Sequence, residues 1–326
     1  MPGGKYALPV TPLVSVVVPT HDRPGRLAAL LAALRAQTLA QGDFEVIIVD
    51  DGSGPETAAL LDSEGDRESG AGGVRRLRRE HAGGPGTARN LGWREARAPL
   101  IAFTDDDCCP GPEWLAAGLR AHLASPRGLI QGRTEPNPDE LDRLGVFSRT
   151  VSVPGPGPQY ETCNIFYPRE LLERLGGFDE AFDARLGGED AELGWRALEA
   201  GRPTGFAHDA LVFHAVHRLG ALGMLRQANR WSGTARVVAR HPGARVMLNR
   251  GVFWNGWHYC LIRSLVALAL PSPVRRFLLT RHAMQLADRA QEAGAGAWAI
   301  PFLLLYDMAE LWAVARGGVR YRTLVL

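Results

Sequence analysis

Three consecutive carboxylates follow a short apolar run in the segment PLIAFTDDDCCPGP, residues 99–112. The run predicts a buried strand over Leu100–Thr104, and Asp105, Asp106 and Asp107 come directly at its end. Adjacent acids repel one another, so at the mouth of a strand they indicate a bound cation. Their hard oxygen atoms suit Mg²⁺ or Mn²⁺ bridging to substrate phosphates better than zinc. A solvated acidic turn is the alternative for such a triplet taken alone.

The segments before this triplet alternate between strand and helix patterns. Continuous β-branched runs predict buried strands over Leu13–Pro19 and Phe44–Asp50, with helices following over Arg26–Leu39 and Pro55–Leu61. A shorter strand is expected over Val74–Leu77, before a glycine-rich loop and a helix. This alternation predicts a mostly parallel sheet that binds ligands at the carboxyl ends of its strands. The first turn, PTHDRPG, lacks the G-x-G-x-x-G of dinucleotide-binding domains.

The segments after the triplet are less regular. We expect a strand over Glu161–Phe166, a last short strand over Leu211–His214, and between them a helix that opens with two acidic residues after two glycines. The long loop Pro136–Pro158 is rich in proline and is a candidate lid over a site. Asp62–Gly73, with its glycine, serine and charged residues, predicts a mobile loop.

The net charge of +2 hides an uneven distribution along the chain. Residues 218–326 hold fifteen arginines and four acidic residues, a formal charge of +11, which leaves −9 for residues 1–217. A basic segment of this kind suggests an anionic surface as a partner. Because almost every basic residue of the chain is arginine, we read that preference as compositional bias and expect no nucleic-acid partner.

The four cysteines have neither a zinc-binding spacing nor a disulfide framework, which favours a reducing cytosol. The first residues, MPGGKYALPVTP, lack the charged and apolar regions of a signal peptide. The protein is therefore expected in the cytoplasm.

Beyond Arg218 the pattern is helical, with helices expected over Val252–Leu270, Pro273–Ala293 and Pro301–Arg316. No uncharged apolar run reaches the ~20 residues needed to cross a bilayer. The stretch FWNGWHYCLIRSLVALAL combines aromatic and basic residues, a composition suited to a membrane interface. The alternative is a helical subdomain that packs on the preceding α/β domain or on a second subunit.

Eight short segments occur in one order: VSVVVPTHDR, FEVIIVDDGS, GGPGTARNLG, IAFTDDDCCPGPEWL, CNIFYPR, LGGFDEAF, GGEDAELGWR and VFHAVH. Together they make residues 1–217 resemble glycosyltransferase family 2, the inverting nucleotide-sugar enzymes of GT-A fold. The resemblance implies an α/β domain over residues 1–217, with a Rossmann-like, mostly parallel sheet flanked by helices. Residues 218–326 would then form a basic, amphipathic helical region outside the family pattern.

The resemblance also implies roles for individual residues. The divalent metal would be held by Asp107 as the principal ligand, together with Asp105 and His214. Asp190 would be the general base, with Glu189 beside it. Contacts to the nucleotide-sugar donor would come from Pro19, Thr20, His21, Asp51, Arg89, Asp106 and Asn164.

Several of these residues have plain structural alternatives. Arg89 could instead pair with a local acid, and His214 could be a packed core histidine. Acids at a helix start, such as Glu189 and Asp190, often serve only the helix dipole. His21 stands where the family commonly has an aromatic residue, which weakens the expectation of stacking on the nucleobase.

The activity that the resemblance implies is transfer of a sugar from a UDP-, GDP- or dTDP-sugar to a hydroxyl of a glycan or lipid-linked acceptor. Its setting would be cell-surface polysaccharide or glycolipid synthesis, with the protein peripheral on the inner face of the cell membrane. A homodimer is left open. A nucleotidyltransferase is disfavoured because the Gly-rich, Lys-bearing phosphate loop is missing after the first strand. A non-catalytic protein that keeps the fold and binds nucleotide or membrane is the other alternative.

Overall fold

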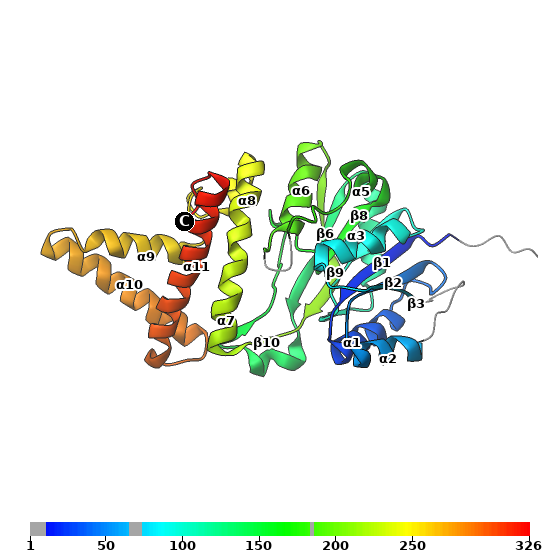
Figure 1. The fold of residues 1–326 in the computed structure, drawn as a ribbon, viewed down its shortest axis with the longest axis horizontal. Coiled ribbons are helices and arrows are strands. Elements are labelled where there is room, and N and C mark those ends of the chain that lie inside the picture. The colour runs from blue at the N-terminus through cyan, green and yellow to red at the C-terminus, as the bar shows by residue number, and fades with distance from the viewer. Residues whose placement is uncertain (1–10, 65–73, 183–185) are drawn as a thin grey trace, which may run out of the picture. The chain divides into compact units, whose positions relative to one another are not determined.

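The computed structural model describes residues 11–64, 74–182 and 186–326, and these divide into two compact units (Figure 1). The sheet unit holds residues 11–64, 74–137, 151–182 and 189–215. The helical unit holds residues 138–150, 186–188 and 216–326. Residues 138–150 and 186–188, which precede residue 217, are thus grouped with the helical unit by their contacts. The sequence predicted one boundary, after residue 217, between a catalytic domain and a helical region, and that division stays a prediction.

The sheet has eight strands in the order β3-β2-β1-β4-β8-β6-β9-β5. Four pairs are parallel, namely β1 with β2, β1 with β4, β2 with β3, and β6 with β9. Strand β8 is antiparallel to both neighbours, and β5 is antiparallel to β9. The strands are β1 Val14–Thr20, β2 Phe44–Asp51, β3 Val74–Arg79, β4 Leu100–Phe103, β5 Cys108–Pro110, β6 Leu129–Pro136, β8 Ile165–Pro168 and β9 Thr204–His214.

Alternate residues of β1 face opposite sides of the sheet, and both sides are covered. Val14, Val16 and Val18 join a core with the leucines of α1 and with residues of α2 and α4. On the other side, a Cβ atom at Gly92 of α3 would collide with Val17, so glycine allows this helix to lie close to the strand. The helices of this unit are α1 Pro24–Arg35, α2 Pro55–Glu64, α3 Pro85–Glu95, α4 Trp114–Ala124, α5 Arg169–Leu175 and α6 Glu189–Glu199.

Several expected boundaries were wrong in the second half of the sheet unit. The strand expected over Glu161–Phe166 begins only at Ile165, because residues 161–164 form a turn closed by the Asn164 amide and the Glu161 carbonyl oxygen at 3.3 Å. Strands β5 and β6 were not expected at all. Strand β9 begins at Thr204, before the expected Leu211, and its pairing with β6 continues through an irregularity after Gly132.

The expected loops also contain regular structure. Within Pro136–Pro158 lie a 3₁₀ helix, η1 Pro138–Arg143, and a short strand, β7 Ser148–Arg149. Of the expected loop Asp62–Gly73, residues 62–64 complete α2, and residues 65–73 lie outside the described part of the chain.

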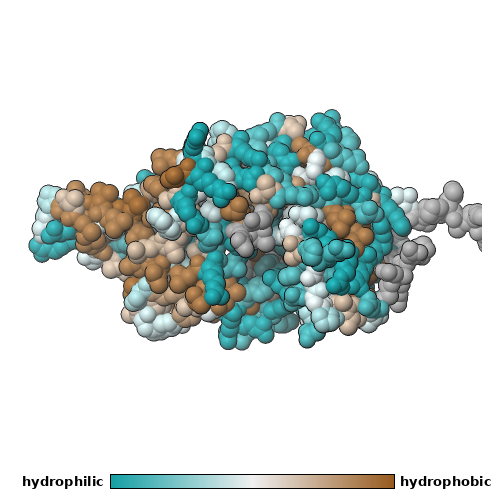
Figure 2. Space-filling view, viewed as in Figure 1, coloured by the Kyte–Doolittle hydropathy of each residue, from teal (hydrophilic) through white to brown (hydrophobic). Residues whose placement is uncertain are grey.

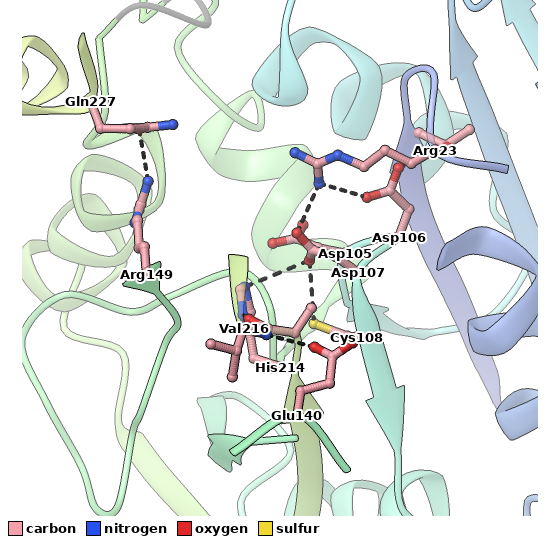
Figure 3. Close-up of polar contacts among 12 residues, drawn as sticks. Arg23, Asp105, Asp106, Asp107, Cys108, Glu140, Arg149, His214, Val216 and Gln227 are labelled. Atoms are coloured by element: carbon pink, nitrogen blue, oxygen red, sulfur yellow. Dashed lines mark hydrogen bonds and ion pairs between the residues drawn. The ribbon is translucent and has the colours of Figure 1, made fainter. Parts of the chain in front are cut away.

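The helical unit begins with two short pairings between distant segments. Strand β7 pairs with β10, His217–Arg218, and the buried Glu140 carboxylate accepts a hydrogen bond from the Val216 amide at 2.8 Å. Arg149 Nη1 also donates to Gln227 Oε1 at 2.9 Å (Figure 3). These contacts fix residues 138–150 to the start of the unit.

Five helices follow, α7 Gly220–Ala228, α8 Ser232–Arg240, α9 Gly256–Ala267, α10 Ser272–Glu292 and α11 Ile300–Tyr321, with 3₁₀ turns η2 Asn229–Trp231, η3 Pro242–Met247 and η4 Ala297–Ala299. Helix α9 starts later than expected because the Asn255 side chain caps it, accepting from the Trp257 and His258 amides. Brown, apolar side chains gather on the surface over α9 and α10 (Figure 2). By length and composition alone, Ala297–Tyr321 could cross a membrane, a test that the core helix of a soluble protein also passes.

Candidate active site

The acidic triplet follows β4, and two of its carboxylates share one guanidinium (Figure 3). Asp106 is buried and accepts hydrogen bonds from Thr20 Oγ1 at 2.8 Å and Arg23 Nη1 at 3.0 Å. Asp107 Oδ2 accepts from the same arginine nitrogen at 2.8 Å. Burial raises the pKa of Asp106 to about 6, while the Arg23 guanidinium opposes that rise. Asp106 and Asp107 are therefore not the solvated turn that was the alternative interpretation.

Arg23 is a site residue that the sequence reasoning missed. It lies between β1 and α1, and its side chain is about half exposed, at 48%. The signal was present in PTHDRPG, where a basic residue follows the carboxyl end of the first strand, the edge at which ligands bind. Its guanidinium contacts the carboxylates of Asp106 and Asp107, two of the three acids that the sequence predicted to lie near a metal ion.

Asp107 and His214 come together through the antiparallel pairing of β5 with β9, in which Cys108 is opposite His214. His214 Nε2 lies 3.6 Å from Asp107 Oδ1, and both side chains are buried. His214 Nδ1 is 2.8 Å from the Ala215 carbonyl oxygen, which can only accept, so Nδ1 carries the hydrogen. In the neutral ring Nε2 then turns a lone pair toward a carboxylate oxygen.

Two facing acceptors repel unless they share a proton or a cation. An imidazole nitrogen and a carboxylate oxygen are also both ligands that Mn²⁺ accepts. Asp107 and His214 therefore fit a divalent metal ion, and they belong to a group of side chains that could hold one. The close approach of Asp107 and His214 supports their expected role as metal ligands, which stays a prediction.

Arg89, on α3, joins the acidic triplet to the acids at the start of α6. Its Nη2 donates to Asp105 Oδ1 at 2.7 Å and its Nη1 to Glu189 Oε1 at 3.2 Å, and the guanidinium is buried. Burial alone would lower the pKa of Arg89, but the two carboxylates outweigh it and raise the pKa further. The local ion pair, which was the alternative for Arg89, is thus present. Asp105 does not belong to the group of described side chains that could hold a metal ion, so its expected metal role has less geometric support than that of Asp107.

Asp190 follows two glycines at the start of α6, and Gly188 has a φ of 117°, a conformation that favours glycine. Its Oδ1 accepts a hydrogen bond from the Ala191 amide at 2.9 Å. Burial raises the pKa of Asp190 to about 7, and the charges of Glu189 and Glu161 add to the rise, while Arg89 opposes it. A carboxyl group with a pKa near neutrality can gain and lose a proton at physiological pH, as a general base must.

Glu161 is the second residue that the sequence reasoning missed. Burial raises its pKa, and its Oε2 atom has no hydrogen-bond partner. The residue was expected only as the start of a strand, and an isolated glutamate gives no signal that it will be buried near another acid.

At the ends of β1 and β2, the residues expected to contact the nucleotide lie side by side. Thr20 is opposite Asp50 in the parallel register, and His21 Nδ1 donates to the Asp51 carbonyl oxygen at 3.0 Å. Pro19 lies within β1, where all seven residues are buried. His21 is about half exposed and is the accessible member of this group.

The Asp51 carboxylate is occupied by its own chain. It accepts hydrogen bonds from the Gly83 amide at 3.1 Å and the Gly84 amide at 2.8 Å, and it pairs with Arg79. These contacts fix the loop that leads into α3. Asp51 therefore has a structural role in addition to the predicted nucleotide contact.

The Asn164 side chain is bonded within the core, and the expected contact with the donor sugar stays a prediction. Its Oδ1 accepts from Trp114 Nε1 at 2.8 Å, and its Nδ2 donates to the carbonyl oxygens of Arg133 and Ala210, each at 2.8 Å. The residue is 2% exposed. Its amide links β6, β9 and α4 inside the core, so both amide hydrogens are already used.

Two family models match the chain. Glycosyl transferase family 2 matches residues 15–176, and Glycosyl transferase family group 2 matches residues 100–308. Among curated relatives, the validoxylamine A glucosyltransferase of Streptomyces hygroscopicus subsp. jinggangensis (strain 5008) is 31% identical over 296 residues, covering 78% of this chain and 67% of that protein. The protein of the same name from subsp. limoneus is also 31% identical, and there the match covers 62% of its length. The chain thus spans about two thirds of the length of these relatives.

Solved structures of similar fold include a mannosyltransferase and the enzyme TarS. The mannosyltransferase PcManGT from Pyrobaculum calidifontis, in complex with GDP-Man and Mn²⁺, superposes with a TM-score of 0.67 at 20% identity, covering 93% of this chain and 87% of that one. Residues 1–349 of S. aureus TarS, in complex with UDP-GlcNAc, superpose with a TM-score of 0.53 at 18% identity, covering 95% of this chain and 91% of that one.

Proposed function

Because the chain belongs to glycosyltransferase family 2, we propose that it transfers a sugar from a nucleotide-diphosphate sugar to an acceptor hydroxyl, with inversion at the anomeric carbon. The expected GT-A fold with a C-terminal helical region is confirmed by the sheet order and by the likeness to solved glycosyltransferases. One observation carries the proposal most directly. Arg89 pairs with Asp105 of the acidic triplet and with Glu189, and the residue after Glu189 is Asp190, a carboxyl group whose pKa is near neutrality.

In the proposed reaction, Asp190 accepts the proton of the acceptor hydroxyl as that oxygen attacks the anomeric carbon. A single base is enough, because the departing nucleoside diphosphate needs charge neutralisation and not a second carboxylate. Glu189 stays paired with Arg89, so it holds the guanidinium in place and leaves Asp190 to take the proton.

A divalent metal ion, Mn²⁺ or Mg²⁺, would be held by Asp107 and His214, and when bound it would neutralise charge on the leaving diphosphate. This set of one imidazole and one carboxylate suits Mn²⁺ better than Mg²⁺. PcManGT, of similar fold, is described in complex with Mn²⁺ and GDP-Man. Arg23 and Arg89 stand beside the triplet, where each already pairs with two carboxylates.

The donor is proposed to be a UDP-, GDP- or dTDP-sugar, with the nucleoside beside His21 and Asp51 at the ends of β1 and β2. The acceptor is proposed to be a glycan or a lipid-linked molecule in cell-surface polysaccharide or glycolipid synthesis. A position on the inner face of the cell membrane would suit such an acceptor, and the +11 charge of residues 218–326 supports it.

Release of nucleoside diphosphate from a panel of UDP-, GDP- and dTDP-sugars, with and without Mn²⁺, tests the activity. We expect one nucleotide to be released in a Mn²⁺-dependent manner, and the rate to rise when the acceptor is present. If no donor in the panel binds or turns over, the non-catalytic alternative replaces this proposal.

A further inference from the structure

Helix α11 buries two acidic residues and exposes several large apolar ones. Asp307 and Glu310 are 0% and 5% exposed, whereas Met308 and Trp312 are 53% and 70% exposed. A surface helix of a soluble protein ordinarily shows the reverse arrangement, with its apolar stripe facing the core. The exposed apolar residues of α11 are therefore not explained by packing within the helical unit.

Both buried acids of α11 contact polar or charged side chains of neighbouring elements. Arg289 Nη1 donates to Asp307 Oδ1 at 2.7 Å, and its guanidinium lies over the Trp257 ring at 4.7 Å. Glu310 Oε2 accepts from Asn255 Nδ2 at 3.3 Å. These contacts join α9, α10 and α11 through charged and polar side chains, so the three helices do not depend on their outward apolar residues to pack together.

The neighbouring helices also place apolar residues outward. Of the nineteen large apolar side chains that are exposed in the described residues, sixteen belong to the helical unit. We define the apolar face as the exposed side chains of Leu265 and Val266 on α9, Phe277 and Met284 on α10, and Met308 and Trp312 on α11. Figure 2 shows the part over α9 and α10 in brown. A contiguous exposed apolar region of this kind marks an interaction surface.

Positive charge accompanies the apolar face. Arg275, Arg276 and Arg281 on α10 are exposed, as are Arg316 and Arg320 near the end of α11. The exposed acids of these three helices are Asp288 and Glu292, both in the last turns of α10. A second copy of the chain would bring the same positive charge against this surface and be repelled, whereas an anionic lipid headgroup layer would be attracted.

We propose that the apolar face of α9, α10 and α11 inserts into the interfacial layer of an anionic lipid bilayer, with the arginines on the headgroups. The contact is through one side of α11 only, because Ala313, Val314, Gly317 and Gly318 are buried on its other side. At Gly317, a Cβ atom would collide with the backbone of Ser232 on α8. Because one side of α11 packs within the helical unit, the helix would lie in the headgroup region of the bilayer without crossing the membrane.

This surface deepens the proposed function, since it would bring the enzyme to a lipid-held acceptor, and in that respect it rests on that function. The lipid binding itself can be measured without any sugar transfer. Full-length protein is sedimented with vesicles of phosphatidylcholine alone and with vesicles that also contain about 30 mol % phosphatidylglycerol, at about 0.1 M and about 0.5 M NaCl.

We expect binding to the anionic vesicles, weakened by salt, and about tenfold weaker binding for the double variant Phe277→Glu/Met284→Glu, because it places charge in the acyl boundary. Both side chains are exposed, so the fold should be kept, and circular dichroism checks this. The matched control is Leu123→Glu, an exposed leucine of α4 in the sheet unit, which should bind as wild type does.

A wild-type protein that stays in the supernatant with anionic vesicles overturns the proposal. So does a dimer in light scattering that the double variant dissociates, because the apolar face would then be a contact between copies. Vesicle binding without release of nucleoside diphosphate from any donor would leave the membrane surface in place and refute the proposed function alone.

Discussion

Asp190→Asn removes the proposed base while keeping the size of the side chain and the hydrogen bond from the Ala191 amide. Loss of general-base catalysis typically costs ~10²–10⁴ in rate, and we expect the turnover number to fall by that factor. Binding of the donor should survive, since the residues proposed to hold it lie at the ends of β1, β2 and β4 and not on α6.

The pKa of Asp190 sets the pH dependence of the wild-type rate. With a pKa of about 7, half of the molecules carry the ionised base at pH 7 and about a tenth at pH 6, so the rate should fall about fivefold from pH 7 to pH 6 and about tenfold for each pH unit below that. In Asp190→Asn the fall of the rate below neutral pH, the acidic limb of the pH profile, should disappear. Initial rates of nucleoside diphosphate release, measured from about pH 5.5 to about pH 8.5 with saturating donor and acceptor, give both results.

The same pKa predicts that Asp190→Asn, although slower, is more stable toward unfolding than the wild type at neutral and higher pH. The folded pKa of Asp190 lies above the unfolded value, so the stability linked to its proton is fully present below about pH 4 and is lost as the pH rises through about 7. Asparagine stays neutral, and Asp190→Asn should therefore be more stable than wild type above pH 7. Because Asp190 is partly exposed, we expect about 1–2 kcal/mol and not the ~4 kcal/mol of complete burial.

Asp209→Asn, at an exposed position of β9, is the control for removing one carboxylate from the same unit and should change neither rate nor stability. If Asp190→Asn transfers sugar at nearly the wild-type rate, Asp190 only caps α6 and the base lies elsewhere. If the variant is slow but its pH profile keeps the acidic limb, another group, such as the buried Glu161, controls the titration.

Three further predictions concern the metal and the core. Asp107→Ala should lose Mn²⁺ binding, measured by calorimetry, and weaken donor binding in Mn²⁺ without unfolding the protein; equal affinities with and without EDTA for both proteins would remove the metal site. Arg23→Ala should raise the affinity for Mn²⁺ about threefold to tenfold, because it removes a cation that competes for Asp106 and Asp107, and an unchanged affinity would contradict that competition. Asn164→Ala should lower the free energy of unfolding by roughly 1–3 kcal/mol, since it leaves buried partners unpaired, and should leave the KM for the donor unchanged; a selective rise in that KM would instead support the donor contact predicted from the sequence.

The first half of the sheet could be predicted because its strands are uniformly apolar and buried. All residues of β1 and β2 are buried, and such runs are legible as central parallel strands. Strand β6, LIQGRTEP, mixes apolar and polar residues, and the buried Gln131 and Thr134 are polar. Its strand character comes from pairing with β8 and β9, which no local pattern records.

The site residues also fall into two groups, those that the strand pattern could predict and those that depend on contacts between distant segments. Asp105–Asp107 and Asp51 lie at the ends of predictable strands, so the rule that ligands bind at that edge of the sheet found them. The contact of Asp107 with His214 depends on β5, which has three residues and was not expected. His214 was named only because the VFHAVH segment resembles the family. Asn164 was assigned to the donor on the same ground, but its position in the core depends on β6, β9 and α4 meeting around it.

The excess of carboxyl groups over guanidinium groups around the site explains why donor binding would need a metal cation. Among the described residues, Asp105, Asp106, Asp107, Glu161, Glu189 and Asp190 bring six carboxyl groups, against the two guanidinium groups of Arg23 and Arg89. Both arginines already contact carboxylates, so neither is spare for an incoming ligand. A donor diphosphate would add further negative charge to this excess, and its binding would be opposed unless positive charge entered with it. The proposed metal site on Asp107 and His214 meets that requirement, and it follows that donor and metal ion should each raise the affinity for the other.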